Sequence, residues 1–498
     1  MLFNSTQFLI FFPIVLLIYY LLPKKVKYIW LLLSSYFFYM CWNVKYSLLL
    51  LTSTVVTYLG GILIEKIKNT SLSDKKQAIS KKAVLIVSLL INLGILFFFK
   101  YFGFFTNILS VSLGKLKINF NAPTFDIILP VGISFYTFQA LGYLIDVYRE
   151  DIKSEKNILK YALFVSFFPQ LVAGPIERSK NLLSQLFVER KFDIEKCIDG
   201  FLIMLWGYFL KIVLADRIAI FVDTAYSDYE NWSGYYLVVA TILFAVQIYC
   251  DFAGYSTIAI GSAKMLGIDL MENFRAPYFS SSVAEFWRNW HISLTSWFKD
   301  YLYIPLGGSR KGAFRKYFNK IVVFLVSGLW HGAAISYIIW GGLNGLYQVI
   351  GELMEPARAK VRKLAKINKE SFGYKFVGGI FTFILVDFSW IFFRAPSTKF
   401  AIEVIKSIFT ASNPWILFDQ SLYHCGLDRK NFTVMLVGII ILAIADVCKI
   451  KGISVIEKIR KQDYWFKCII IPIFIWAILM FGIWGPNYEA ANFIYFQF

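Results

Sequence analysis

The sequence predicts an all-α protein that crosses a membrane several times. Hydrophobic residues make up 58% of the 498 residues and charged residues only 17%, whereas about a quarter of the residues in a soluble protein are charged. The mean hydropathy is +0.59, and apolar runs recur along the whole chain. A soluble globule cannot bury so much apolar surface, and a disordered chain would not carry it.

The apolar runs give the expected elements in order, because a helix needs about 20 mostly apolar residues to cross a bilayer. They cover residues 8–22, 28–42, 46–64, 83–105, 125–145, 159–172, 200–222, 235–249, 321–329, 333–350, 376–393, 432–447 and 466–483. Several runs are shorter than a bilayer requires, so we expect some to be tilted, broken or re-entrant. No long linker or internal repeat separates them, and we expect residues 1–498 to form a single integral membrane domain.

Basic residues between the runs predict the orientation, since cytoplasmic loops are enriched in Lys and Arg. Lys24, Lys25 and Lys27 follow the first run, whereas only Lys45 follows the second. We therefore expect a multi-pass protein of the cell membrane with its N-terminus outside. The alternation fails after residues 159–172, and we expect this run to re-enter the membrane without crossing it. The cytoplasmic side is also expected to hold three later basic clusters, at residues 310–320, 358–369 and 449–461.

The chain has only three histidines, and each is weighed by its surroundings. His331 lies in GLWHGA (328–333) between apolar stretches, which predicts two short helices broken near the glycines. A histidine at membrane depth is costly and indicates a functional site, although it could also join helices through a carbonyl. His291 lies in EFWRNWHIS (285–293), within an amphipathic segment at the cytoplasmic interface, where function and simple packing are equally good explanations. His424 is expected in an exposed loop.

The remaining signals narrow the chemistry. The six cysteines are scattered without a C-x-x-C pair, and no metal site is expected. The sequence has no G-x-S-x-G, H-E-x-x-H, Walker A or G-x-G-x-x-G motif.

Asp251 and Asp387 look buried, and each is expected either to be functional or to pair with an arginine or cap a helix. The net charge of +19 is explained by the cytoplasmic loops, so no nucleic-acid partner is expected. These signals leave histidine-assisted transfer of an activated group inside a membrane protein.

At these motifs the sequence resembles the membrane-bound O-acyltransferase family, in the bacterial branch that O-acetylates alginate and other polysaccharides. The matching segments are MLFNS (1–5), FFFKY (97–101), LPVGISFYTFQ (129–139), AGPI (173–176), FWRNWHISL (286–294), DYLYIPLGG (300–308), GLWHGA (328–333) and FIYFQF (493–498). They span essentially the whole chain, in order. Asn289 stands where a basic residue is typical, and residues 253–257 are less polar than is typical, so donor and acceptor specificity stay open.

The resemblance implies a helical bundle with re-entrant segments around a central tunnel. It also implies acyl transfer from a cytoplasmic thioester to an acceptor reached from the other side. His331 matches the catalytic histidine of the family, and His291 matches its second signature histidine. We expect His331 to act as general base and His291 to bind or polarise the donor. Substrate-binding roles are expected for the neighbouring residues Trp287, Arg288, Asn289, Trp290 and Trp330, with the tryptophans excluding water.

The resemblance also implies the partners. We expect no bound cofactor, acetyl-CoA or an acyl-carrier protein as cytoplasmic donor, and membrane lipid around the helices. An extracytoplasmic acetyltransferase or hydrolase-like partner would pass the group to a polysaccharide. Two alternatives remain: D-alanyl transfer from a carrier protein to teichoic acid, and a transporter without covalent chemistry. Release of the donor thiol would separate an enzyme from a transporter.

Overall fold

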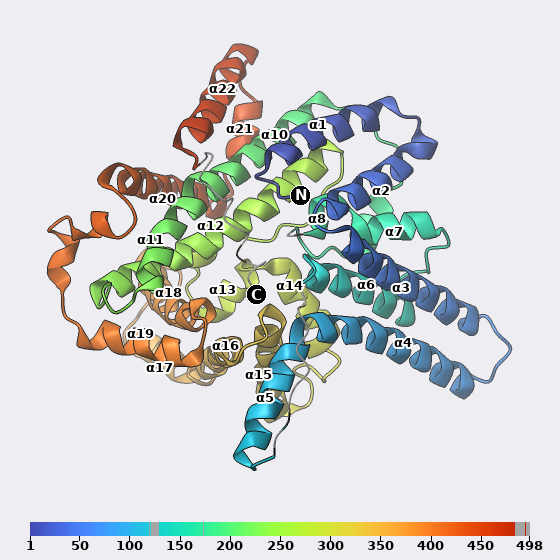
Figure 1. Ribbon diagram of the computed structural model, residues 1–498, viewed down its shortest axis with the longest axis horizontal. Helices are drawn as coiled ribbons and strands as arrows, with labels where there is room; N and C mark the ends of the chain where they lie inside the picture. The colour runs from blue at the N-terminus through green and yellow to red at the C-terminus, as the bar shows by residue number, and fades with distance from the viewer. Residues whose placement is uncertain (119, 121–128, 173, 484–493, 495–498) are drawn as a thin grey trace. The chain divides into compact units, whose positions relative to one another are not determined.

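The computed structural model describes residues 1–118, 120, 129–172, 174–483 and 494. Every regular element among these residues is a helix, as the sequence predicts (Figure 1). The chain divides into two compact units. Unit 1 comprises Met1–Phe201 and Ala259–Met271, and unit 2 comprises Leu202–Ile258 and Glu272–Phe498. Parts of the predicted run 125–145 and of the segments 173–176 and 493–498 lie outside the described residues.

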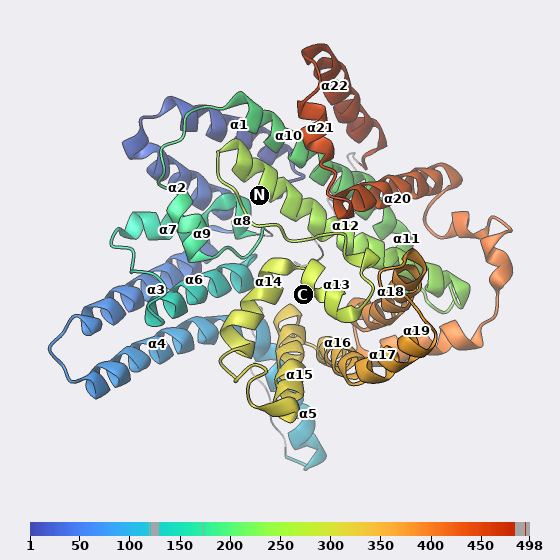
Figure 2. The same cartoon turned by 180° about the vertical axis from the view of Figure 1, so that it is seen from behind.

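Unit 1 is built from the helices of the first part of the chain. They are α1 (Thr6–Leu21), α2 (Lys24–Met40), η1 (Val44–Tyr46), α3 (Ser47–Lys68), α4 (Asp74–Leu96), η2 (Phe97–Tyr101), α5 (Phe102–Lys115), α6 (Ile133–Tyr148), α7 (Ile158–Ser166), α8 (Phe168–Leu171) and α9 (Ser179–Gln185). The helices α3, α4 and α6 lie side by side (Figures 1 and 2). The run 159–172 breaks at Phe167 into α7 and α8, which are 9 and 4 residues long. Both helices are far too short to cross a bilayer. A segment that re-enters the membrane without crossing it is expected to contain helices as short as these.

Unit 2 holds the rest, and α10 (Ile194–Tyr208) and α12 (Tyr235–Met265) contribute residues to both units. Its helices are η3 (Phe209–Ala215), α11 (Asp216–Ser227), η4 (Pro277–Phe279), α13 (Val283–Asn289), α14 (Ile292–Phe298), η5 (Lys299–Tyr303), α15 (Gly312–His331), α16 (Ile335–Leu353), α17 (Glu355–Leu364), α18 (Phe372–Arg394), α19 (Thr398–Thr410), η6 (Pro414–Leu417), η7 (Ser421–His424), α20 (Arg429–Ile450), α21 (Val455–Arg460) and α22 (Tyr464–Phe481). The amphipathic segment predicted at 273–310 forms the short helices α13, α14 and η5.

Seven helical runs are long and apolar enough to cross a membrane, judged on the described residues alone. They are Val44–Lys68, Asp74–Lys115, Ile194–Ser227, Tyr235–Met265, Phe372–Arg394, Arg429–Ile450 and Tyr464–Phe481. Many large apolar side chains on these helices are exposed, including Trp476 and Leu479 of α22. Lipid is the environment that favours such surfaces. The chain is a multi-pass membrane protein.

The predicted end of one run is wrong. The run at 235–249 was expected to stop before Asp251, but α12 continues to Met265 and is 31 residues long. Asp251 is buried and pairs with Lys211 of η3, whose Nζ lies 2.6 Å from Asp251 and 2.8 Å from Asp216. A paired carboxylate can lie inside an apolar helix bundle, so the helix need not end there. Of the alternatives weighed for Asp251, the structure shows ion pairing, with a lysine in place of an arginine.

The basic cluster at 310–320 is also only partly a loop. α15 begins at Gly312, so Lys316 and Lys320 lie on its first turns and not in a connection between helices. Both ammonium groups pair with Glu352 near the end of α16. A lysine can extend its charged end along the helix surface toward a partner, and this allows a helix to begin well before its apolar part.

The helices α15 and α16 form an antiparallel hairpin, and α18 packs against α16 (Figure 2). Glycines bring the two helices of the hairpin close together. A Cβ atom on Gly328 would lie 2.2 Å from the carbonyl oxygen of Tyr337, and one on Gly341 would lie 2.2 Å from that of Phe324. Only glycine allows backbones to approach so closely. This hairpin positions the residues described next.

Candidate active site

His331 is the last residue of α15, at the turn of the hairpin. Gly332 and Ala334 have extended backbones, and α16 begins at Ile335. The helix break predicted near the glycines is therefore present, but the two helices are 20 and 19 residues long and not short as predicted. A Cβ atom on Gly332 would lie 2.1 Å from Cε2 of Tyr337. Glycine at this position lets the chain turn against the Tyr337 ring, which fixes where His331 stands.

Aromatic rings from three helices enclose the imidazole of His331, whose residue is only 3% exposed. Its ring centroid lies 4.9 Å from that of Trp330, 5.0 Å from that of Trp340 and 5.4 Å from that of Phe393. All three pairs are edge-to-face, which is a favoured arrangement for aromatic rings. The cage restricts the imidazole and reduces the access of bulk water to it.

The cage continues into a cluster of buried tryptophans. Trp287 of α13 lies 5.6 Å from Trp340, which stacks on Trp390 of α18, and Trp390 lies 5.2 Å from Trp290. A buried amide connects the same helices. Asn344 of α16 accepts a hydrogen bond from Nε1 of Trp287 at 3.1 Å and donates one to Oγ of Ser389 at 3.2 Å. Three different helices are thus joined around His331.

His291 stands between α13 and α14 with a left-handed backbone, at φ 44° and ψ 55°. Such a conformation costs a non-glycine residue about 1 to 3 kcal/mol and persists only where its surroundings hold it. Two backbone hydrogen bonds do so: Ile292 N donates to Asn273 O at 2.9 Å, and Arg275 N donates to Asn289 O at 3.0 Å. One of the left-handed non-glycine residues of the described chain is thus a residue that the sequence already marks as a candidate.

The imidazole of His291 is buried, with its residue 1% exposed. Its Nδ1 lies 3.1 Å from Oδ1 of Asn273. The ring meets Phe252 edge-on at 4.6 Å and lies 6.1 Å from Trp330. Burial lowers the pKa of His291 from 6.5 to about 3, because desolvation penalises the charged form. The ring is neutral at physiological pH.

The structure brings most of the predicted site residues together. His291 and His331 both contact the indole of Trp330, and Trp287 and Trp290 belong to the surrounding cluster. The other two residues point elsewhere. Arg288 is exposed, and the Asn289 amide donates to Ser280 Oγ at 3.1 Å. Their substrate-binding role stays a prediction. His424 is exposed on η7, as expected.

Four residues of the site were missed from the sequence: Asn273, Trp340, Asn344 and Phe393. Asn344 carried a usable signal, because an amide inside an apolar run, one helical turn after a tryptophan, indicates a buried hydrogen bond. Phe393 and Trp340 are common residues for an apolar run, and nothing distinguishes them there. Among the described residues, no group of three or more His, Cys, Asp or Glu side chains could hold a metal ion.

A cavity of about 190 Å³ lies beside Trp287. Its lining is mostly apolar and includes Phe298 and Phe324, together with the ammonium-bearing residues Lys299 and Lys320. The same cavity reaches Ser327, which lies one helical turn before His331 on α15. The cavity is thus lined by cationic side chains and by a residue of α15 that is close to His331 in sequence.

Comparison with known proteins shows what the chain is similar to in sequence. The family model of MBOAT, membrane-bound O-acyltransferase family, matches residues 149–384, which include both His291 and His331. The probable alginate O-acetylase AlgI of Pseudomonas aeruginosa is 36% identical over 447 residues, covering 89% of this chain and 80% of the relative. The peptidoglycan O-acetyltransferase of Helicobacter pylori is 33% identical over 465 residues, covering 87% and 83%. The teichoic acid D-alanyltransferase of Streptococcus thermophilus is 28% identical over 283 residues, covering 54% and 66%. The chain is an acyltransferase that belongs to the membrane-bound O-acyltransferase family.

Proposed function

We propose that this chain takes an acetyl group from a cytoplasmic thioester donor for the O-acetylation of an exported or cell-surface polysaccharide. The observation that carries the proposal is His331, a caged imidazole at a helix break in an acyltransferase chain. The names of the relatives support acetyl as the group and a polysaccharide as the acceptor. Membership in the family argues against a transporter without covalent chemistry.

His331 acts as the general base. It removes the proton from the acceptor hydroxyl while the oxygen attacks the thioester carbonyl carbon. The new C–O bond forms, the C–S bond breaks, and the proton held by His331 passes to the departing thiolate, which leaves as the free thiol. A thioester is already activated, so orientation and proton removal are the main contributions that the protein must supply. A positioned general base contributes about 100- to 10,000-fold to the rate.

The donor enters from the cytoplasmic side as acetyl-CoA. The cavity beside Trp287 supports this assignment. Its volume of about 190 Å³ is smaller than that of typical ligand pockets, roughly 300–1,000 Å³, and suits the narrow thioester-bearing end of acetyl-CoA. Lys299 lines it and could bind a phosphate group of the donor. The buried tryptophans around His331 limit hydrolysis of the thioester by keeping water away.

The acceptor side is extracytoplasmic. A partner enzyme outside the membrane receives the acetyl group and passes it to the polysaccharide, and the N-terminus of the chain lies on that side. The basic residues after the first apolar run support this orientation. Membrane lipid surrounds the exposed apolar faces of the helices.

Inverted membrane vesicles test the proposal. The vesicles carry the protein together with its polysaccharide system, and radiolabelled acetyl-CoA is supplied at their outer, formerly cytoplasmic face. The expected result is release of free coenzyme A and the appearance of label in the lumenal polysaccharide. Thiol release without lumenal label from vesicles that contain the complete system would contradict transfer across the membrane.

A second donor is favoured by one observation, the similarity to a teichoic acid D-alanyltransferase. The same vesicles supplied with D-alanyl carrier protein distinguish the two donors. Transfer from the carrier protein and silence with acetyl-CoA would replace the acetyl assignment while keeping the acyltransferase chemistry.

A further inference from the structure

The amide of Asn273 has only one orientation that satisfies its neighbours. Two donors from Ser293 converge on Oδ1: the backbone N–H at 3.3 Å and the hydroxyl Oγ at 2.9 Å. A backbone N–H can only donate. The atom that faces it must therefore be the carbonyl oxygen, because an amide NH₂ in its place would set two donors against each other.

This orientation determines which nitrogen of His291 carries the proton. Nδ1 lies 3.1 Å from the same Oδ1 of Asn273 and 3.5 Å from Ser293 Oγ, whose own hydrogen is donated to Oδ1. The carbonyl oxygen of Asn273 can only accept a hydrogen bond, so Nδ1 of His291 must be the donor and bears the hydrogen. In a neutral imidazole the second nitrogen, Nε2, then carries the lone pair and is an acceptor.

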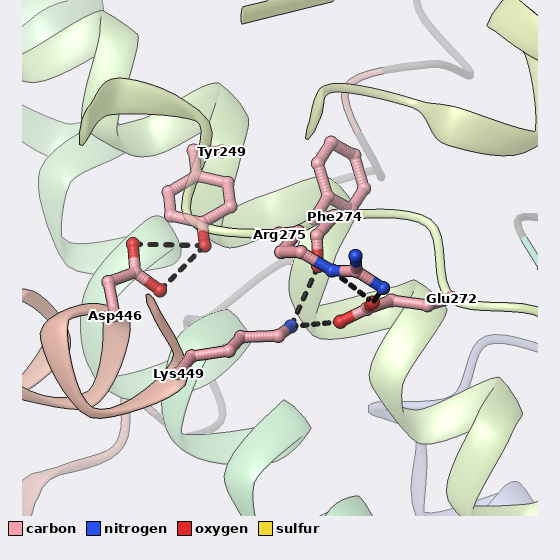
Figure 3. Close-up of polar contacts among 6 residues, drawn as sticks. All are labelled: Tyr249, Glu272, Phe274, Arg275, Asp446 and Lys449. Carbon is pink, nitrogen blue, oxygen red and sulfur yellow. Dashed lines mark hydrogen bonds and ion pairs between the residues drawn. The ribbon is translucent and has the colours of Figure 1, made fainter. Parts of the chain in front are cut away.

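The segment that presents Asn273 is fixed on both sides. Lys449 of α20 donates to Phe274 O at 2.7 Å and pairs with Glu272 at 2.5 Å, and Glu272 also pairs with Arg275 at 2.8 Å (Figure 3). The backbones of Asn273 and Arg275 are hydrogen-bonded to those of Ile292 and Asn289, on either side of His291. The amide thus has little freedom to move away from the imidazole.

We infer that Asn273 is a positioning residue that holds His291 as the Nδ1–H tautomer, so that Nε2 accepts a hydrogen bond from an O–H or N–H of the substrate. The role toward the substrate rests on the proposed function, whereas the tautomer does not. Burial keeps the ring neutral and supports the same state. A ring in this state cannot donate from Nε2 to the thioester carbonyl, so His291 holds the substrate and does not polarise the donor.

Nitrogen-15 spectroscopy of the histidine rings tests the tautomer directly. The full chain is labelled with ¹⁵N-histidine and measured by solid-state NMR in lipid bilayers at alkaline pH. Only three histidines contribute, and His291→Gln and His424→Gln variants assign the signals. The expected spectrum shows a protonated Nδ1 and an unprotonated Nε2 for His291. A protonated Nε2 in the wild-type protein would overturn the inference.

Two substitutions separate positioning from general stability. Asn273→Ala removes the acceptor, so the His291 signals should change to those of a mixed tautomer, with kcat for acetyl transfer reduced about 100-fold and KM for acetyl-CoA little changed. Asn273→Asp keeps an oxygen acceptor of the same shape and should preserve the Nδ1–H signal.

Asn92→Ala is the matched control. It removes another buried amide, whose Oδ1 accepts a hydrogen bond from Ser53 Oγ at 2.6 Å, and should leave the His291 signals unchanged. Unchanged His291 signals in Asn273→Ala would overturn the inference. The expected signals in a wild-type protein that transfers no acetyl group would instead contradict the proposed function and leave the tautomer assignment standing.

Discussion

The two candidate histidines are held in different ways, and this difference matters for what each can do. His331 is enclosed by ring edges from Trp330, Trp340 and Phe393. His291 is held by an amide and a constrained backbone. Aromatic edges restrict a ring without prescribing its protonation, whereas a carbonyl acceptor prescribes the tautomer. Ring contacts thus fix the position of His331, whereas the amide of Asn273 also sets the tautomer of His291.

The buried His291 should make the protein sensitive to acid. Its pKa is lowered to about 3 in the folded chain and is near 6.5 when unfolded, so between these values only the unfolded chain binds the proton. The free energy of unfolding should therefore fall as the pH decreases below 6.5, by about 1.4 kcal/mol per pH unit. Thermal unfolding of wild type and His291→Gln between neutral pH and pH 5 measures this, with a smaller acid loss expected in the variant. An equal loss in both proteins would refute it.

The sequence alone predicts the site residues whose type is rare in apolar segments. His291 and His331 could be predicted because a histidine between apolar runs is unusual, and the tryptophans beside them share their motifs. Asn273 could not, because it lies 18 positions before His291 and its role depends on a backbone conformation that no motif encodes. Trp340 and Phe393 reach His331 only through the packing of α15, α16 and α18.

At the scale of elements, the α15–α16 hairpin is the main determinant of the site. Gly341→Ala should destabilise the protein by about 1 to 3 kcal/mol through overpacking and lower acetyl transfer, because the new Cβ would meet Phe324 O at 2.2 Å. The matched control is Gly342→Ala, whose Cβ would lie 3.5 Å from Leu325 Cδ2, an ordinary contact. Thermal stability and transfer rate are measured for both. Equal behaviour of the two variants would show that the close approach is unimportant.

The buried charges of unit 2 should also be structural. Lys211→Met should reduce the free energy of unfolding by about 3 to 5 kcal/mol, because it leaves the buried carboxylates of Asp216 and Asp251 without their cation. Lys399→Met removes an exposed pair with Glu403, and exposed pairs contribute about 0 to 1 kcal/mol. Denaturation of both variants in detergent provides the comparison. A Lys211→Met protein as stable as Lys399→Met would contradict the assignment.

Element positions were predictable to different degrees. The apolar runs located most helices, and the two glycines located the hairpin turn. The extents of α12 and α15 were wrong, because Asp251 and the α15 lysines appear as helix ends in a sequence. Their partners, Lys211 and Glu352, are distant in the chain, so the pairing that lets these helices continue is visible only in the structure.

For the whole molecule, the orientation in the membrane can be tested with cysteines. The amino group of Met1 donates to Phe38 O at 3.0 Å, so the exposed Cys41 lies at the same end of unit 1 as the N-terminus. With Cys41 as the sole cysteine, a membrane-impermeant maleimide should label intact cells. A Ser71→Cys variant without native cysteines, in the exposed α3–α4 loop, should react only after permeabilisation. The reverse pattern would place the N-terminus inside.

The central claim is that His331 removes a proton during acetyl transfer, and the most direct measurement compares histidine variants of the full chain in the inverted vesicles described above, which supply the acceptor. Thiol release and label transfer from radiolabelled acetyl-CoA are followed for wild type, His331→Ala and His424→Ala, with monodispersity in detergent confirming that each is folded. We predict that transfer is abolished in His331→Ala and unchanged in His424→Ala, since His424 is exposed and distant from the site in sequence. Wild-type transfer by a folded His331→Ala protein would contradict the account.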